Sequence, residues 1–466
     1  KGKVMSYTKG AMDILLDRCK KIYLNGEIID INKQHIEDIN KAATEMARGA
    51  LRVLALGIKE DDDSASEENL TFVGLVGMID PPRPEAKASV KTLKNAGIKT
   101  IMITGDHKDT ALAIAKELGI AEDENQCITG GELNELTQED LNKKVENIRV
   151  FARVSPEHKV MIVKAFKFNG SIVSMTGDGV NDAPSLKAAD IGVAMGITGT
   201  DVAKGASDMV LTDDNFATIE KAVAEGRGIY KNIQKTVLFL LSSNFGEVIS
   251  MFSAIAAGLA APLQSIHILW INLITDSLPA LALGVDPKDS EIMNEKPRDS
   301  MESLFAHGGL AFTIYNGAMI AALTLGAFLW SPIMHLNEAG MAVTLDNIRY
   351  MLEQIIMVNG AEYSIIKHAQ TYAFTTLGIS QLFHAIGMRN YDKSLFQMSH
   401  IDNLAMIGAF AAGLLMQVLV TEIPFLTEVF ETSQLSLKEW INLILLSAIP
   451  LVSHEIIVIG KKLMKK

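Results

Sequence analysis

Cysteine is scarce in this sequence, and aromatic residues make up only 6% of it. Two cysteines, Cys19 and Cys127, occur in 466 residues, too few and too scattered for a disulfide framework or a thiolate metal site. Lys and Arg number 43 against 55 Asp and Glu, which gives a formal net charge of −12. This acidic balance argues against nucleic acid as a partner, because phosphate backbones attract basic surfaces.

Charged residues are sparse in the second half of the chain. They make up about 29% of residues 1–235 but only about 13% of residues 236–466, and the mean hydropathy of the whole chain is +0.21. This division indicates a soluble α/β part followed by a membrane part, and it excludes a purely cytosolic protein. The length alone suggests about three domains.

Short apolar runs alternate with stretches of helical spacing in the soluble part. The runs are rich in Val, Ile and Met and are bounded by Gly or Asp, as buried parallel strands are. The alternation predicts a doubly wound sheet with its reactive groups at the carboxyl ends of the strands. The predicted strands are Phe72–Ile79, Lys99–Thr104, Ser171–Thr176, Asp190–Met195 and Asp208–Thr212, and the predicted helices are Pro84–Ala96, Asp109–Leu118, Pro156–Phe168 and Asp182–Ala188.

Six apolar stretches in the second half are long enough to span a bilayer. If the soluble part is cytosolic, six spans return the C-terminus to the cytosol, and nine basic residues then lie inside against three outside. This distribution satisfies the positive-inside rule, so we expect a multi-pass membrane protein. The predicted spans are Thr236–Leu259, Ile266–Gly284, Gly309–Trp330, Thr371–Met388, Leu404–Val420 and Ile441–Ile459.

The most specific string in the chain is Met175-Thr-Gly-Asp-Gly-Val-Asn-Asp-Ala-Pro184. It ends a predicted strand and opens a predicted helix, and it groups Asp178, Asn181 and Asp182 at the turn. Hard oxygen ligands at the end of a strand suit Mg²⁺, which binds phosphates through few carboxylates. The alternative is a Gly-Asp turn with a helix cap. The specificity of the whole ten-residue string favours the Mg²⁺ interpretation.

Two weaker elements point to the same chemistry. In Ile103-Thr-Gly-Asp-His107, the Thr104 hydroxyl and the Gly105 amide can hold phosphoryl oxygens, because small residues permit close backbone approach. In Ala152-Arg-Val-Ser-Pro-Glu-His-Lys159, Lys159 lies just inside a helix start and could neutralise a phosphoryl group. Taken alone, the first could be a plain turn and the second a solvated lysine.

Together these strings resemble the P-type ion-pumping ATPases, whose phosphorylation domain has a haloacid-dehalogenase-like, Rossmann-like fold. The resemblance implies that Asp178 is a Mg²⁺ ligand, that Lys159 neutralises the phosphate, and that Asp182 supports the loop. It also implies that Thr104 and Asn181 contact the phosphoryl group. The catalytic set implied is Thr104, Gly105, Asp106, Lys159, Asp178, Asn181 and Asp182.

The resemblance extends to ATP binding near the N-terminus. Tyr7-Thr-Lys-Gly-Ala11 is similar to the Lys-Gly-Ala string of the family's nucleotide domain, and Leu51-Arg-Val-Leu-Ala55 is similar to its nucleotide-contacting Arg segment. Asp80-Pro-Pro-Arg83 resembles the hinge between the nucleotide and phosphorylation domains. The ATP-binding residues implied are Lys9, Arg52, Thr104, Gly105, Asp106 and Arg153.

Parts of the family pattern do not occur in this sequence. It contains no Asp-Lys-Thr-Gly-Thr string, so the phosphorylated aspartate is not in this chain, and no Thr-Gly-Glu-Ser actuator loop. Six spans are visible where the family has ten. We therefore expect the C-terminal half of a pump, which needs the N-terminal half as its partner and does not turn over alone. The expected domains are residues 1–79 (nucleotide-binding part), 80–233 (phosphorylation and stalk) and 234–466 (six-helix membrane domain).

Two of the apolar stretches carry polar residues at helical spacing. Asn244 and Glu247 share one helical face, and Asn272, Thr275 and Asp276 lie at i, i+3 and i+4 of the next stretch. An uncompensated carboxylate in hydrocarbon costs at least ~2.5 kcal/mol, and a bound cation offers the compensation. All-oxygen side chains suit Ca²⁺, and Pro279 could open the helix nearby. The alternative is an interhelical hydrogen-bond network without an ion.

The same residues resemble the Ca²⁺ pumps of the sarcoplasmic-reticulum type and their bacterial relatives. Sodium-potassium pumps carry an acid where this chain has Asn272, and heavy-metal pumps carry Cys or His in the membrane. Gln381 stands where the sarcoplasmic-reticulum pump has a liganding Glu. His384 could be a ligand but is more simply a packed histidine, and Glu455 is more simply a snorkelling or paired acid near the inner surface.

The sequence therefore predicts half of an ATP- and Mg²⁺-dependent Ca²⁺ pump in a lipid bilayer, the plasma membrane if the source is bacterial. The visible acids and one expected glutamate supply −3 against the +4 of two Ca²⁺, so we expect one Ca²⁺ per ATP. The alternatives are a P-type pump for Mn²⁺ or Na⁺, a membrane-anchored phosphatase of the same soluble fold, and a channel or scaffold with an inactive nucleotide domain.

Overall fold

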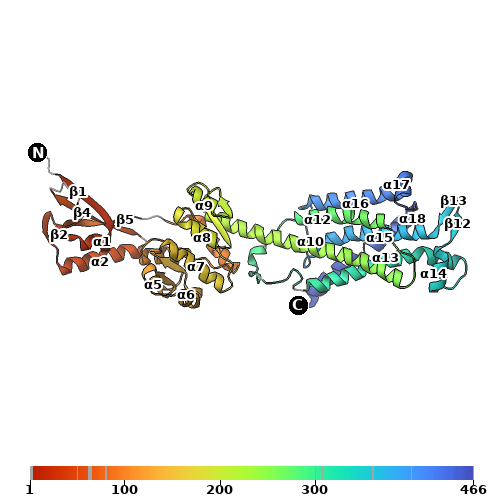
Figure 1. Cartoon of the computed structure of the whole chain (residues 1–466), viewed down its shortest axis with the longest axis horizontal. Helices are drawn as coiled ribbons and strands as arrows, with labels where there is room; N and C mark the ends of the chain where they lie inside the picture. The colour runs from red at the N-terminus through yellow and green to blue at the C-terminus, as the bar shows by residue number, and fades with distance from the viewer. Residues whose placement is uncertain are drawn as a thin grey trace. The chain divides into compact units, whose positions relative to one another are not determined.

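The computed structural model describes the chain except for residues 1–3, 50, 61–65, 79–80, 300, 307, 359–360, 400 and 465–466. It separates into two compact units (Figure 1). The first unit comprises Lys1–Val223 with Met293–Ser300, and the second, called here the membrane unit, comprises Ala224–Ile292 with Met301–Lys466. The proposed hinge string begins at Asp80, which lies outside the described residues.

A five-stranded mixed sheet opens the first unit. Its strand order is β1-β4-β5-β2-β3, and β5 pairs antiparallel with β4 and parallel with β2. The expectation that residues 72–79 form a strand of the doubly wound sheet is therefore wrong, because β5 finds its partners in this separate sheet. Its elements are β1 (Met5–Ala11), α1 (Met12–Asp17), β2 (Cys19–Leu24), β3 (Glu27–Asp30), α2 (Lys33–Arg48), β4 (Arg52–Glu60) and β5 (Leu70–Met78).

The rest of the first unit is built from parallel strands and helices. The hydrogen-bonded strands form two three-stranded sheets, β6-β8-β7 and β11-β10-β9, rather than the one sheet expected. Strands β7 and β8 were not predicted, because three residues are too few to show a period. The strands are β6 (Met102–Ile103), β7 (Cys127–Thr129), β8 (Val150–Ala152), β9 (Ser174–Gly177), β10 (Ile191–Met195) and β11 (Met209–Leu211).

The helices between these strands begin where the sequence places Pro, Ser, Thr or His. Ser155 caps α7 by accepting a hydrogen bond from the His158 amide, with Pro156 as the first helical residue. All four predicted helices are present, with ends shifted by at most one residue. The helices are α3 (Pro84–Asn95), α4 (Lys108–Leu118), α5 (Gly130–Asn134), α6 (Gln138–Lys144), α7 (Pro156–Phe168), α8 (Ala183–Ala188) and α9 (Asp201–Gly205), with short 3₁₀ turns η1 (Glu124–Gln126), η2 (Val145–Asn147) and η3 (Val180–Asp182).

Among the residues that the structure describes, five helical segments are long and apolar enough to cross a membrane. The first, α10 (Phe216–Ala256), packs closely on α13 (Gly309–Glu338), where a Cβ on Gly246 would lie 2.9 Å from an Ile320 side-chain atom. The second is interrupted by the π-helical turn η4 (Ile271–Asp276) between α11 (Ser265–Trp270) and α12 (Ser277–Gly284). The others are α13, α16 (Leu404–Glu422), and α18 (Leu437–Ser447) with α19 (Ile449–Met464).

The predicted fourth span falls in α15 (Ile365–Met388), which is not one of these five segments. Helix α15 packs against α13, α16, α18 and α19, and nearly all of its side chains are buried by protein. Such a helix carries polar side chains such as Thr375 and Gln381 that lower its hydropathy. The remaining elements of the membrane unit are η5 (Ile292–Asn294), α14 (Leu345–Leu352), the β12 (Ile355–Val358) and β13 (Ala361–Ser364) hairpin, η6 (Leu395–Gln397) and α17 (Pro424–Val429).

Candidate functional site

Acidic and amide side chains from three helices meet inside the membrane unit. Glu247 lies on α10, Asp276 ends the π turn η4, and Gln381 lies on α15. Their exposed fractions are 5%, 1% and 0%, so all three are shielded from solvent. A chain that buries two carboxylates among apolar helices needs compensating partners for them.

Gln381 joins two of these helices to its own. Its Nε2 donates to Glu247 Oε1 at 3.1 Å, and its Oε1 accepts from Thr275 Oγ1 at 3.2 Å. Asn272 Nδ2 donates to the other oxygen of Glu247 at 3.4 Å. The structure therefore brings together Glu247, Asn272, Thr275 and Gln381, which were predicted as one site from stretches up to 134 residues apart.

Asp276 is the group without compensation in this cluster. Neither of its carboxylate oxygens has a hydrogen-bond partner among the described residues, although both are fully buried. A buried carboxylate that accepts no hydrogen bond is costly unless a bound cation or a proton compensates its charge. The side chains of the cluster offer carboxylate, amide and hydroxyl oxygens as metal ligands, which fit Ca²⁺ better than a softer metal.

The π turn has a local cause in the sequence. Pro279 has no backbone N–H, so it cannot bond the carbonyl four residues earlier, that of Thr275. The helix widens over the turn before it, and side chains bond the backbone there: Ser277 Oγ donates to the Asn272 carbonyl at 2.9 Å. The helix is therefore widened before Pro279, but it stays helical from Ser265 to Gly284. That its backbone carbonyls bind an ion remains a prediction.

Asn244 is less closely associated with the cluster than predicted. It lies one turn from Glu247 on α10, and its side chain is exposed. His384 is packed and hydrogen-bonded, as the simpler interpretation predicts: it is 3% exposed, and its ring lies 2.8 Å from Ser242 Oγ. Glu455 accepts from Ser394 Oγ at 2.7 Å and so stabilises a loop.

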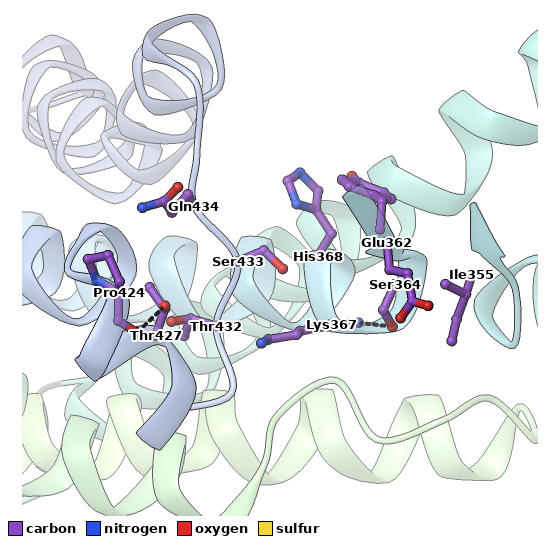
Figure 2. A pocket seen from close by; sticks show the side chains of 11 residues that line it. Ile355, Glu362, Ser364, Lys367, His368, Pro424, Thr427, Thr432, Ser433 and Gln434 are labelled. Atoms are coloured by element: carbon purple, nitrogen blue, oxygen red, sulfur yellow. Dashed lines mark hydrogen bonds between the residues drawn. The ribbon is translucent and has the colours of Figure 1, made fainter. Parts of the chain in front are cut away.

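Described residues of the membrane unit line at least two cavities. One of about 330 Å³ is lined by Glu247 and by the apolar side chains of Val248, Met251, Phe252 and Ile268, so it reaches the carboxylate cluster. A larger one, of about 540 Å³, lies beside the β12–β13 hairpin and the first turn of α15 (Figure 2). None of the predicted ion ligands lines the larger cavity, which separates it from the candidate ion site.

In the first unit, Asp182 organises the loop that follows β9. Its Oδ2 accepts from the amides of Asp178 (3.2 Å) and Gly179 (3.0 Å), and Lys159 Nζ lies 2.5 Å from its Oδ1. Gly177 is required at the end of the strand, because a Cβ there would lie 2.4 Å from the Cβ of Asp182. Lys159 and Asp182 thus form one pair, and the loop backbone is held by the carboxylate.

The charge of Asp182 is stabilised by these contacts. Burial by itself would raise the pKa of this carboxyl, but the hydrogen bond from Lys159, the Gly179 amide and the Lys159 charge outweigh it. The pKa therefore lies below its ordinary value. Asp178 and Asn181 carry exposed side chains on the same loop. A solvent-facing carboxylate on a rigid loop can hold Mg²⁺ together with a phosphate.

The second turn follows β6 and is held by its own side chains. Thr104 Oγ1 donates to Asp106 Oδ2 at 3.0 Å and accepts from the Asp106 amide at 3.1 Å. Gly105 has open space where a Cβ would stand, so its backbone is approachable. Ile103 packs in the same apolar cluster as Met175, which brings the ends of β6 and β9 together.

The predicted ATP-binding residues are divided in the structure. Lys9 pairs in register with Leu56, so Lys9 and Arg52 lie on the same face of the five-stranded sheet, about four residues apart along it. Arg52 Nε lies 3.8 Å from Asp106 Oδ1. Arg153 instead pairs with Asp13, at 3.1 Å, and this pairing outweighs burial and lowers the pKa of the Asp13 carboxyl.

One polar centre in the membrane unit was not predicted. Asp286 is buried and accepts from Arg389, Lys235 and Asn403, which are far apart in the sequence. Each of these residues lies at an end of an apolar stretch, where a charged residue is ordinarily read as a solvated boundary. The distances between them are set by packing, so no sequence period indicates the cluster.

Two family models match the chain. The model described as "P-type ATPase, cytoplasmic domain N" matches residues 1–85, and the one described as "Cation transporting ATPase, C-terminus" matches residues 260–459. These matches cover the five-stranded sheet and most of the membrane unit. Both models describe parts of one kind of protein.

Similar proteins agree with the models. "Calcium-transporting ATPase 1" of Bacillus cereus is 53% identical over 98% of this chain and 51% of its own length. "Calcium-transporting ATPase" of Bacillus subtilis is 43% identical over 95% and 47%, and a calcium-transporting ATPase of Listeria monocytogenes is 39% identical over 93% and 46%. The chain spans about half the length of the curated relatives it matches. On these matches, the chain belongs to the P-type ATPase family.

Proposed function

We propose that this chain is the C-terminal half of an ATP-driven Ca²⁺ pump. The observation that carries the proposal is Asp276, a fully buried carboxylate with no hydrogen-bond donor among the described residues. It follows Thr275, which bonds Gln381, and Gln381 in turn bonds Glu247. A passive membrane anchor has no need of buried acids, which argues against a membrane-anchored phosphatase. The names of the relatives support Ca²⁺ as the ion.

The ion ligands proposed are Asn244, Glu247, Asn272, Thr275, Asp276 and Gln381. Carboxylate, amide and hydroxyl oxygens suit Ca²⁺, which accepts six to eight of them. Gln381 supplies an oxygen without a charge, so the visible acids and one glutamate from the other half would balance one Ca²⁺ better than two. Mn²⁺ and Na⁺ are the alternative ions, and the cation dependence of ATPase activity separates them.

The first unit would bind ATP and Mg²⁺. We propose a haloacid-dehalogenase-like phosphorylation domain over residues 80–233, with part of the nucleotide domain over residues 1–79. The nucleotide would be contacted by Lys9 and Arg52, and also by Gly105 and Asp106. Arg153 is expected there too, but its side chain pairs with Asp13 in this structure. Asp178 would hold Mg²⁺, which neutralises phosphate charge when bound.

The reaction proposed is transfer of the γ-phosphoryl group to an aspartate in the other half of the pump. The carboxylate oxygen bonds to phosphorus as the bond to ADP breaks, and water later releases inorganic phosphate. Thr104 and Asn181 would orient the phosphoryl oxygens, and Lys159, held by Asp182, would stabilise their charge. Phosphorylation and hydrolysis would switch access to the ion site.

The membrane part is proposed to have six spans, residues 234–466, with α15 as the buried one. The basic residues flanking the spans then place the first unit in the cytoplasm, and a bacterial source implies the plasma membrane. The N-terminal half of the pump, ATP, Ca²⁺ and lipid would be the partners of the chain.

Ion-dependent phosphorylation of the complete pump tests this function. Acid-stable labelling from [γ-³²P]ATP should require Ca²⁺ at micromolar levels and should not be replaced by Mn²⁺ or Na⁺. Labelling without Ca²⁺, or labelling that follows Mn²⁺ or Na⁺ instead, would overturn the ion assignment. A protein that hydrolyses phosphate esters but never forms the phosphoenzyme would support the phosphatase alternative.

A further inference from the structure

A polar seam joins α10 to the end of α12. Asn232, Lys235 and Thr236 lie at i, i+3 and i+4, on one face of α10. Asn232 Nδ2 donates to the carbonyls of Asp286 (2.7 Å) and Gly284 (3.4 Å). Thr236 Oγ1 donates to the Ala280 carbonyl of α12 at 3.4 Å. Helix α12 ends at Gly284, and its last carbonyls have no partner within the helix. Side chains of α10 therefore satisfy the end of the helix that follows Asp276.

Asp286 is the centre of the seam. Its Oδ1 accepts from Arg389 Nε at 2.7 Å and from Asn403 Nδ2 at 2.8 Å, and its Oδ2 accepts from Lys235 Nζ at 3.0 Å. The side chains of Asp286, Arg389 and Lys235 are 4%, 8% and 12% exposed. Two cations and one carboxylate are thus buried together, an arrangement whose desolvation cost apolar side chains of similar size would avoid.

The links to Asp286 fall into two groups. Arg389 follows α15 and Asn403 caps α16, and Asn403 also donates to the Ala282 carbonyl of α12 at 2.9 Å. These contacts hold α12, α15 and α16 to one another. Lys235 links that group to α10 by an ion pair with Asp286.

Two of the helices that meet at the seam, α10 and α15, also carry a group of the candidate ion site. Glu247 lies 12 residues after Lys235 on α10, about 18 Å along the helix, and Gln381 lies eight residues before Arg389, about 12 Å along α15. The hydrogen bond from Gln381 to Glu247 spans 3.1 Å, and the bond from Asn272 spans 3.4 Å. A change of register of α10 by one residue shifts Glu247 by about 1.5 Å and turns it by about 100° around the helix axis, away from both partners.

We propose that Lys235 and Asp286 form a register lock that holds Glu247 opposite Gln381 and Asn272. They are positioning residues, remote from the ion itself, and the inference rests on the proposed function as a cation pump. An ion pair suits this role because it is satisfied at one register only, whereas an apolar contact tolerates sliding. If α10 slipped along its axis, Glu247 would lose its position opposite Gln381 and Asn272, and ion binding would weaken. The phosphorylation site would be unaffected.

The test compares variants of the complete pump. Lys235→Met keeps the length and apolar stem of the side chain and removes the charge, and Lys235→Arg keeps the charge. Lys288→Met is the matched control, because Lys288 also pairs with α10, through Glu225, but both side chains are largely exposed. The readouts are the Ca²⁺ concentration for half-maximal phosphorylation from ATP, phosphorylation from inorganic phosphate without Ca²⁺, and the melting temperature.

Lys235→Met should raise the half-maximal Ca²⁺ concentration about tenfold, with phosphorylation from inorganic phosphate and the melting temperature close to wild type. Lys235→Arg should restore the affinity to within about twofold, and Lys288→Met should change nothing. An unchanged Ca²⁺ affinity in Lys235→Met, or an equal loss in Lys288→Met, would overturn the lock. A melting temperature that falls in proportion to the loss of affinity would also overturn it, since that outcome indicates a merely structural pair.

Two further arms keep the inference decidable. If Lys235→Met does not accumulate, Lys235→Gln, which keeps a donor without the charge, replaces it: a several-fold loss of affinity supports the lock and an unchanged affinity overturns it. If the unmodified pump is not activated by Ca²⁺, the proposed function fails, and the same variants measured with the activating cation still decide the lock.

Discussion

Gln381 Nε2 donates to Glu247 Oε1 at 3.1 Å, across 134 residues of sequence. This bond makes an amide the neutral bridge between two helices of the candidate ion site. A carboxylate at the same position would face Glu247 and repel it unless a cation lay between them. With an amide at this position, the site needs less cation charge to balance its acidic groups. This is the basis of the first prediction.

The number of ions per cycle should be one Ca²⁺ per phosphorylatable enzyme. Two Ca²⁺ bring more charge than the visible acids and one further glutamate can balance in a low-dielectric site. Equilibrium binding of ⁴⁵Ca²⁺ to the complete pump measures this ratio, and Gln381→Glu tests whether an added charge permits a second ion. A ratio of two in the unmodified protein would contradict the charge argument.

Asp276 should matter more for ion binding than Thr275. Both are buried, but a carboxylate supplies a full charge, whereas the Thr275 hydroxyl supplies only a dipole. Asp276→Asn should abolish Ca²⁺-activated phosphorylation from ATP while leaving phosphorylation from inorganic phosphate possible, and Thr275→Ala should only lower the apparent affinity. Wild-type Ca²⁺ affinity in Asp276→Asn would mean that the ion binds elsewhere.

Asp178 should be needed for phosphoryl transfer. Its side chain is exposed on the loop that Asp182 holds. Asp178→Asn removes a charge proposed to bind Mg²⁺, so phosphoenzyme formation should fall at least ~10²-fold, as for the loss of one transition-state electrostatic contact. Rapid-quench ³²P labelling measures the rate. Labelling near the wild-type rate at ordinary Mg²⁺ levels would contradict the assignment of Asp178 as a Mg²⁺ ligand.

The Lys159–Asp182 pair should make stability depend on pH. The pKa of Asp182 is lower in the folded protein than its ordinary value of 3.8. A depressed carboxyl pKa contributes stability that is fully present above the unfolded-state pKa and is lost as pH falls through the folded-state value. Asp182→Asn should therefore destabilise the protein at pH 7, on the order of 2 kcal/mol for a hydrogen bond to a charged group.

The difference between wild type and Asp182→Asn should shrink once the pH falls below about 4. Melting temperatures of the two proteins between pH 7 and pH 3 measure this difference. Asp190→Asn offers a comparison at an ion pair of greater exposure, with Lys167, where the effect should be smaller. A stability difference that stays constant down to pH 3 would show that the ion pair is not its source.

Local patterns were sufficient for several parts of this protein. The division into a charged first part and an apolar second part follows from composition, and the string from Met175 to Pro184 has its strand, turn and helix start as expected. The π turn follows from Pro279, because a missing N–H acts on the residues of one turn. Such features depend on neighbours a few residues away, so a sequence pattern carries them.

Features that depend on distant partners were decided by the tertiary structure. Strand β5 looks like any buried strand, and only pairing with β4 and β2 assigns it to the five-stranded sheet. The sequence predicts a span within α15, but this helix is more polar than the five apolar segments, and the structure shows that protein buries nearly all of its side chains. Its polarity makes sense only beside the helices that cover it.

The sequence by itself determined which residue types are available to the ion site: Glu247, Asp276 and Gln381 stand out as polar groups within apolar runs. The tertiary structure alone decided that Gln381 bonds Glu247, that Asp276 is left without a donor among the described residues, and that Asp286 gathers Lys235 and Arg389. The physical reason is that hydrogen bonds and ion pairs act over about 3 Å, and helix packing alone brings residues 51 to 134 positions apart within that distance.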